Sequence, residues 1–241
     1  MSLVFEEIDS QVSPLGQISL RRRRIPAFGD RDIYEVKLGD EFLMSSMFVE
    51  AEEALSTLGL AAVQGDQLSV VVGGLGLGYT AVAALKDDRI KEQLVVDALQ
   101  TVIDWHKDER VPLGTVLNAD ARNRYVLGSF FDLATDPVTG FDPDSQGKQF
   151  DAILLDIDHS PTEYLNAANA SFYTTDNLAL MAQQLKPGGV FAMWSQNLPE
   201  ERFEALLNTV FEQVDSHVVS FYNPLQGGES TNSVYVCVKG E

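Results

Sequence analysis

The stretch Val70-Val71-Val72-Gly73-Gly74-Leu75-Gly76-Leu77-Gly78-Tyr79-Thr80 decides the fold. It begins as a continuous apolar strand and passes into a turn with glycines at positions 74, 76 and 78. Without side chains, glycines let the backbone turn tightly and approach a bound nucleoside at the carboxyl edge of a sheet. Counting from Gly74, the third glycine of the dinucleotide fingerprint G-x-G-x-x-G would fall at Tyr79. The pattern therefore argues against a nicotinamide or flavin enzyme.

The chain on both sides of this turn alternates apolar strands with helical segments. Strands are expected at 68–72, 93–96, 125–127, 152–155 and 190–194. Helices are expected at 80–85, 102–106 and 175–185, the last ended by Lys186-Pro187-Gly188-Gly189. This order predicts an α/β fold with a doubly wound, mostly parallel, seven-stranded sheet covered by helices on both faces. The segments 214–222 and 233–239 have no helix between them and predict a final hairpin with an antiparallel last strand.

Residues 1–48 differ from the rest, because their short alternating strands predict a small antiparallel β region. Residues 49–241 are expected to form the ligand-binding α/β domain. The run Arg21 to Arg24 places its side chains alternately on two faces, which favours a charged, solvated edge strand. Helical spacing over 50–62 places four apolar residues on one face: Ala54, Leu55, Leu58 and Ala62.

Composition narrows the class of protein. The 241 residues include 36 acidic and 17 basic ones, and a formal charge of -19 makes nucleic-acid binding improbable while mildly favouring a cationic substrate. No apolar stretch approaches the roughly 20 residues of a membrane-spanning helix, and no secretory signal is visible. A cytoplasmic protein is expected. The single cysteine, Cys237, excludes disulfides, and the isolated His106 and His217 give metal binding no support.

Asp97 ends the strand that follows the glycine turn, about 20 residues after it. At this spacing a carboxylate accepts hydrogen bonds from both ribose hydroxyls. The alternative is that Asp97 caps the helix leading to Trp105. The coincidence of strand end, glycine turn and spacing favours ribose binding.

The strand at 152–155 ends in Asp156-Ile157-Asp158-His159. Ligands of parallel sheets bind beyond the carboxyl ends of the strands, so these side chains should share an edge with the glycine turn and Asp97. If the strand persists, its period of two sends Asp156 and Asp158 to one side. Alternatively, Asp158 and His159 lie in a solvent-facing loop and Asp156 alone matters.

These segments together resemble the polyamine aminopropyltransferases of the spermidine synthase family, which have the class I S-adenosylmethionine-dependent methyltransferase fold. The resemblance runs from about Gly16 to Trp194. It is carried by the glycine turn, by Phe150 to Asp156, by Leu185 to Val190 and by the β-rich N-terminal region. The acid-x-acid turn and the pair Trp194-Ser195 are similar to the short spermidine synthase-like members.

The resemblance implies that an amine displaces methylthioadenosine from a carbon beside a sulfonium. An ammonium cannot attack, so the site must hold the cation and then accept a proton. This work falls to Asp156, assisted by Asp158 or His159, and the like charge of neighbouring carboxylates should raise the pKa of one of them. The implied ligand is decarboxylated S-adenosylmethionine or S-adenosylmethionine, bound by Gly74, Gly76, Gly78, Asp97, Ser129 and Phe130. A small cationic acceptor such as putrescine and a homodimer are also implied.

Three positions depart from the family pattern. Gly76 stands where the full-length synthases have an aspartate that pairs with the aminopropyl ammonium of the ligand. Ser129 replaces the adenine-contacting aspartate, and His159 replaces the aspartate three residues after Asp156. Each loss removes a charge-assisted contact worth roughly 1.5 to 3 kcal/mol if unreplaced. Alignment adds Gln17, Tyr34 and Glu53 as further candidates near the site.

Two other functions stay open. The first is an S-adenosylmethionine-dependent methyltransferase acting on another small substrate, since the fold serves both reactions and Gly76 lacks the signature of the decarboxylated ligand. The second is a non-catalytic nucleoside-binding protein that retains the pocket. The cluster from Asp156 to His159 argues against the second function.

Overall fold

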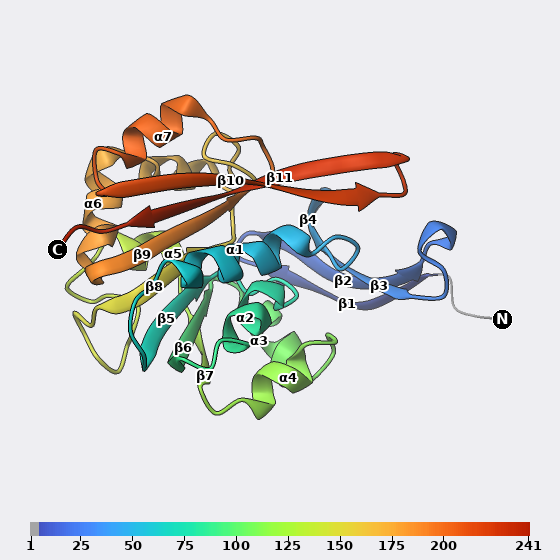
Figure 1. Cartoon of the computed structure of the whole chain (residues 1–241). Helices are drawn as coiled ribbons and strands as arrows, with labels where there is room; N and C mark the ends of the chain where they lie inside the picture. The colour runs from blue at the N-terminus through green and yellow to red at the C-terminus, as the bar shows by residue number, and fades with distance from the viewer. Residues whose placement is uncertain (1–4) are drawn as a thin grey trace.

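The computed structural model describes residues 5–241, which form two β-sheets and the helices that cover the larger one (Figure 1). The small sheet is antiparallel, in the order β1-β2-β3-β4, and the large sheet has the order β10-β11-β9-β8-β5-β6-β7. Strands β9 to β7 of the large sheet are parallel to one another, and β11 is antiparallel to both β9 and β10. The predicted α/β class, the mostly parallel seven-stranded sheet and the antiparallel final strand are confirmed.

The small sheet comprises β1 (Phe5–Ser13), β2 (Gly16–Arg24), β3 (Asp32–Leu38) and β4 (Glu41–Ser45). The large sheet comprises β5 (Leu68–Gly73), β6 (Ile90–Asp97), β7 (Asn123–Leu127), β8 (Phe150–Leu155), β9 (Leu185–Ser195), β10 (Gln213–Asn223) and β11 (Gly228–Val238). The helices are α1 (Glu50–Ala61), α2 (Tyr79–Leu85), α3 (Gln100–Lys107), α4 (Gly114–Ala119), α5 (Phe130–Ala134), α6 (Thr175–Gln183) and α7 (Glu201–Leu207), with 3-10 turns at Pro26–Phe28 and Ala167–Phe172. None of these helices is long and apolar enough to cross a membrane.

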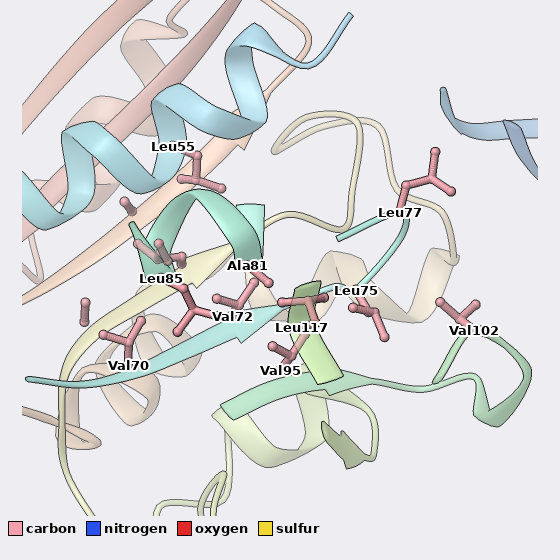
Figure 2. Close-up of a cluster of buried hydrophobic side chains, with 14 of the residues drawn as sticks. Leu55, Val70, Val72, Leu75, Leu77, Ala81, Leu85, Val95, Val102 and Leu117 are labelled. Carbon is pink, nitrogen blue, oxygen red and sulfur yellow. The ribbon is translucent and has the colours of Figure 1, made fainter. Parts of the chain in front are cut away.

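Strand β5 serves two hydrophobic cores, one on each face of the large sheet. Val70 and Val72 belong to the core shared with helices α1 to α4, and Figure 2 shows them with Leu55 of α1 and Ala81 of α2. Val71 belongs to the opposite core, shared with α5, α6 and α7. Burial on both faces explains why β5 is a continuous apolar run rather than an alternating one.

The arginine run lies in β2, and the prediction of an edge strand is wrong. Strand β2 is paired with β1 on one side and β3 on the other, so it is central in the small sheet. Each arginine pairs with an acidic side chain of a neighbouring strand or turn: Arg21 with Glu7, Arg22 with Glu6 and Asp32, Arg23 with Glu35, and Arg24 with Asp30 and Asp32. Charges that would protect an exposed edge are instead neutralised between strands.

Helix α1 has the predicted position but a different buried face. Ser56 and Gly59 are buried together with Leu55, whereas Ala54 and Leu58 are only partly buried. The close approach of the sheet explains the small residues, since a Cβ atom at Gly59 would lie 2.8 Å from the Leu154 side chain of β8. This packing turns the N-terminal part of α1 toward the carboxyl ends of the central strands.

Candidate active site

The carboxyl ends of the parallel strands bring most of the predicted site residues to one edge of the large sheet. Along this edge Ser129 follows β7, Asp97 ends β6, Gly74 follows β5, Asp156 follows β8 and Trp194 is the penultimate residue of β9. All five line one cavity of about 480 Å³. Pockets of this size hold small organic ligands, and a nucleoside fits within this range.

The glycine turn is packed tightly against its surroundings. Gly74 has φ +93°, and a Cβ atom there would collide with the backbone carbonyl of Asp156. Gly76 has φ +46°, and a Cβ atom there would lie 2.6 Å from Sδ of Met44 in β4. That sulfur also accepts a hydrogen bond of 3.0 Å from the backbone N–H of Leu77. Glycine is therefore required at 74 and 76 both by conformation and by space.

Gly78 does not line the cavity, although we predicted it to bind the ligand. It is the N-cap of α2, with φ +92°, and a Cβ atom there would approach the ring of His106 and the side chain of Leu117 at about 3 Å. Its role is close helix packing. Nδ1 of the buried His106 lies 3.0 Å from the carbonyl oxygen of Val102, and burial lowers the pKa of this histidine. His106 therefore packs inside the fold, between α3 and the start of α2.

Asp97 accepts hydrogen bonds from the nearby backbone and also lines the cavity, where ribose binding was predicted. Its Oδ2 accepts a hydrogen bond of 3.0 Å from the N–H of Leu75 in the glycine turn, and its Oδ1 accepts one of 2.8 Å from the N–H of Leu99 at the start of α3. A carboxylate has about four acceptor positions, and the backbone of Gly76 also approaches this one, so at least one position remains for a ligand hydroxyl. Burial raises the pKa of Asp97. The side chain thus fixes the turn and still presents an acceptor in the cavity wall.

Ser129 and Phe130 also lie in the cavity wall, each with a structural task as well. Ser129 caps α5 by accepting a hydrogen bond of 3.3 Å from the N–H of Asp132. Phe130 is almost fully buried, and a Cβ atom at Gly73 would collide with its ring. The Phe130 ring also lies 5.1 Å from that of Phe141 in the core. Both predicted residues are therefore placed beside the ligand space by the start of α5.

Asp156 faces a second carboxyl group, that of Glu52 on α1, which the sequence analysis missed. Both line the cavity, and the Thr80 hydroxyl donates a hydrogen bond of 2.6 Å to Oδ2 of Asp156. Burial raises the pKa of Asp156 to about 6, and burial together with the negative charge of Asp156 raises the pKa of Glu52 to about 8. Near neutral pH the two carboxyl groups therefore share about one proton.

Asp158 is not in the cavity wall, which corrects the prediction that it assists Asp156. Strand β8 ends at Leu155, so the alternation that would align the two aspartates does not continue. Oδ1 of the buried Asp158 accepts hydrogen bonds of 2.8 Å from the N–H of Leu165 and from Nδ2 of Asn169, and Oδ2 accepts one of 2.8 Å from the Tyr173 hydroxyl. Asp158 organises the loop between β8 and α6, and this loop supplies part of the cavity wall.

His159 lines the cavity at the point where the small sheet meets the β8 loop. Its Nε2 lies 3.1 Å from Oε1 of Glu41 at the start of β4. The alignment candidates are placed elsewhere: Gln17 is exposed, Tyr34 does not line the cavity, and Glu53 pairs with Lys86 at 3.1 Å on the surface. The residue next to Glu53 in sequence, Glu52, is the one that enters the site.

Comparison of the sequence with protein-family models and with curated proteins gives no match. The structure is similar to that of a spermidine synthase solved in complex with the transition-state analogue AdoDATO, with a TM-score of 0.72 and 18% sequence identity over 97% of this chain and 74% of that chain. It is also similar to a spermidine synthase from Thermotoga maritima, with a TM-score of 0.70 and 17% identity over 97% of this chain and 72% of that one. The chain therefore has a spermidine synthase-like fold.

Proposed function

We propose that this protein is a transferase that moves an aminopropyl group from decarboxylated S-adenosylmethionine to a small amine. The carboxyl pair of Glu52 and Asp156, in the wall of a nucleoside-sized cavity, carries the proposal. No lysine or arginine lines this cavity within residues 5–241. Such a site attracts a cationic acceptor and repels the carboxylate of undecarboxylated S-adenosylmethionine.

The residues along the cavity fit the adenosyl part of the ligand. Asp97 offers a free acceptor position for a ribose hydroxyl beside the glycine turn. Leu99 and Phe131 give the wall apolar surface near Ser129, and Ser129 and Asp132 add polar groups for a base edge. When bound, the sulfonium ligand supplies a carbon that an amine can attack, with the C–S bond breaking and methylthioadenosine leaving.

The carboxyl pair performs the acid–base part of the reaction. Ionised Asp156 holds the acceptor ammonium and takes a proton from it, so that the nitrogen has a free lone pair when the N–C bond forms. A pKa of about 6 suits a base that must be ionised near neutral pH and still accept a proton. Thr80 orients this carboxylate by its hydrogen bond, and Glu52 adjusts the charge of the site because the two neighbouring carboxyl groups share a proton.

A second candidate, methyl transfer from S-adenosylmethionine, is favoured by one observation. Met44 fills the space next to Gly76, so no carboxylate can extend there from position 76 toward an aminopropyl ammonium. The two carboxyl groups of Glu52 and Asp156 argue for the decarboxylated ligand instead. Direct measurement of ligand preference separates the two reactions.

The test is calorimetric titration of the purified protein with S-adenosylmethionine, its decarboxylated form and methylthioadenosine, followed by turnover with amines. We expect the decarboxylated ligand to bind at least about tenfold more tightly than S-adenosylmethionine, and an amine to release methylthioadenosine. Preference for S-adenosylmethionine would favour methyl transfer, and binding without turnover would favour the non-catalytic function. Asp97→Ala should weaken binding of all three nucleosides, whereas Asp104→Ala, on the polar side of α3, should not.

A further inference from the structure

The small sheet contacts the large-sheet domain through β1 at one end and through β4 at the other. At one end, Nε1 of Trp105 in α3 donates a hydrogen bond of 2.7 Å to Oδ2 of Asp9 in β1. At the other end, Glu41 of β4 contacts His159, which lies in the loop that follows β8. Strand β1 therefore lies on the side of Asp97, and β4 lies on the side of Asp156. Side chains of β4 that line the cavity accordingly belong to the half where an acceptor would sit.

Within residues 5–241, the small sheet contributes only apolar side chains to the cavity: Leu15, Val36, Leu38, Leu43 and Met44. Trp194 of β9, the strand next to β8, adds an indole to the same half of the cavity as Leu43 and Met44. Apart from His159, the wall around the carboxyl pair is thus hydrocarbon and aromatic on the side away from Asp97.

Among the described residues, four acidic ones line the cavity, and they divide into two groups. Asp97 and Asp132 follow β6 and β7, on the nucleoside side, while Glu52 and Asp156 form the single pair near β8. Asp158 lies outside the wall with both oxygens already bonded to the β8 loop. On the acceptor side, one ammonium therefore finds a carboxyl pair, and a second ammonium would meet apolar surface and His159 but no further carboxylate of the described residues.

We propose, building on the proposed transferase function, that the acceptor is a primary monoamine with an apolar body rather than a diamine. Its ammonium binds at Glu52 and Asp156, and its hydrocarbon or aromatic body lies against Leu43, Met44 and Trp194. A second ammonium against Leu43, Met44 and Trp194 would lose hydration without gaining a carboxylate partner, which is costly. Each methylene buried in its place strengthens binding by about fourfold.

Two amines of equal length test this directly. Putrescine and n-pentylamine differ only in that a terminal ammonium is replaced by a methyl group. With decarboxylated S-adenosylmethionine, we expect n-pentylamine to give at least about tenfold higher kcat/KM than putrescine, measured as methylthioadenosine release with the product identified by mass. Equal or better turnover of putrescine would overturn the inference and leave aminopropyl transfer intact.

Binding of the same amines to the methylthioadenosine complex separates the two proposals. If neither amine turns over but n-pentylamine binds more tightly by calorimetry, the acceptor preference stands and aminopropyl transfer fails. If neither amine binds, the inference is overturned.

A variant reverses the chemistry of the wall. Leu43→Glu places a carboxylate on the acceptor side and should shift the preference toward putrescine by about tenfold or more. Phe42→Glu is the matched control, because Phe42 neighbours Leu43 on β4, is 41% exposed and does not line the cavity. A shift of equal size in both variants would show a general charge effect and contradict the proposed wall.

Discussion

The Thr80 hydroxyl donates a hydrogen bond of 2.6 Å to Oδ2 of Asp156, joining the first turn of α2 to the end of β8. Thr80 lies two residues after Gly78, the last glycine of the turn, and the N–H of Asp156 donates a hydrogen bond of 2.8 Å to the carbonyl of Gly73 at the start of that turn. The carboxylate assigned to catalysis and the backbone assigned to nucleoside binding are therefore held in one rigid unit. Preorganisation of this kind is what a displacement reaction requires.

Thr80→Val should move the pH dependence of turnover. The Thr80 hydroxyl stabilises the ionised carboxylate and lowers the pKa of Asp156 against the effect of burial. Its loss should raise the pH of half-maximal kcat by about one unit. The measurement is a pH–rate profile. Thr80→Ser keeps the hydroxyl and should retain the original profile, whereas an unchanged profile in Thr80→Val would argue against Asp156 as the base.

Asp156→Asn and Asp158→Asn should have opposite effects on turnover and stability. Asp156→Asn removes the base and should lower kcat by about 100-fold or more while methylthioadenosine still binds. Asp158→Asn should leave most of kcat but lower the free energy of unfolding by about 2 kcal/mol, because all three donors to this buried acid lose a charged partner. Steady-state kinetics and urea unfolding measure the two quantities. Loss of kcat in a fully stable Asp158→Asn protein would restore Asp158 to the reaction.

Glu52→Gln should make stability less dependent on pH. The pKa of Glu52 is raised to about 8 in the folded protein, above its value of about 4.3 in an unfolded chain. The folded protein therefore binds more protons, and this group's stabilising effect is complete below about pH 4 and is lost as the pH rises through about 8.

Between pH 5 and pH 8, the Tm of the wild-type protein should therefore fall by roughly 5 °C more than that of Glu52→Gln. Thermal unfolding monitored by circular dichroism gives both values. Glu53→Gln serves as the control, because the neighbouring Glu53 pairs with Lys86 on the surface. The same pH dependence in all three proteins would show that Glu52 is not a protonated buried group.

Gly76→Ala should be destabilising, and Met44→Ala should relieve part of the effect. The new Cβ atom would lie 2.6 Å from Sδ of Met44, and φ +46° is unfavourable for alanine by about 1 kcal/mol. We expect Gly76→Ala to cost about 2 kcal/mol or more of unfolding free energy, with the double variant recovering the steric part only. A double-mutant cycle by urea unfolding measures this coupling. Purely additive effects would contradict contact between the two positions.

Most of the large sheet could be predicted from the sequence because its strands carry a local signal. Strands β5 and β6 end in Gly73 and Asp97, and β8 is followed directly by Asp156, so glycine or aspartate marks the functional edge. The segment Lys186-Pro187-Gly188-Gly189 was read as the stop of a helix, and it is also the first part of β9. The backbone turns within this segment at Gly188, whose φ of +69° only glycine adopts readily.

Glu52, the site residue that was not predicted from the sequence, has no comparable local signal. The sequence contains Glu50, Glu52 and Glu53 in the first turn of α1, and acidic residues are common there because they complement the helix dipole. Which of them is buried depends on the rotation of α1 against the sheet, and this is set by the small residues Ser56 and Gly59. Their spacing of four and seven from Glu52 was the available clue, but an analysis based on apolar residues overlooks it. The central position of β2 likewise depends on pairing partners distant in sequence.

Cross-strand charge in the small sheet restricts how β2 can change during evolution. The Glu35 side chain is only 6% exposed and pairs with Arg23, so a neutral residue at position 23 would leave a buried anion without a partner. The more exposed pairs, such as Arg21 with Glu7, tolerate loss far better. Substitution at position 23 is therefore expected to persist in descendants only when position 35 changes with it, and these two sites should covary while their neighbours drift.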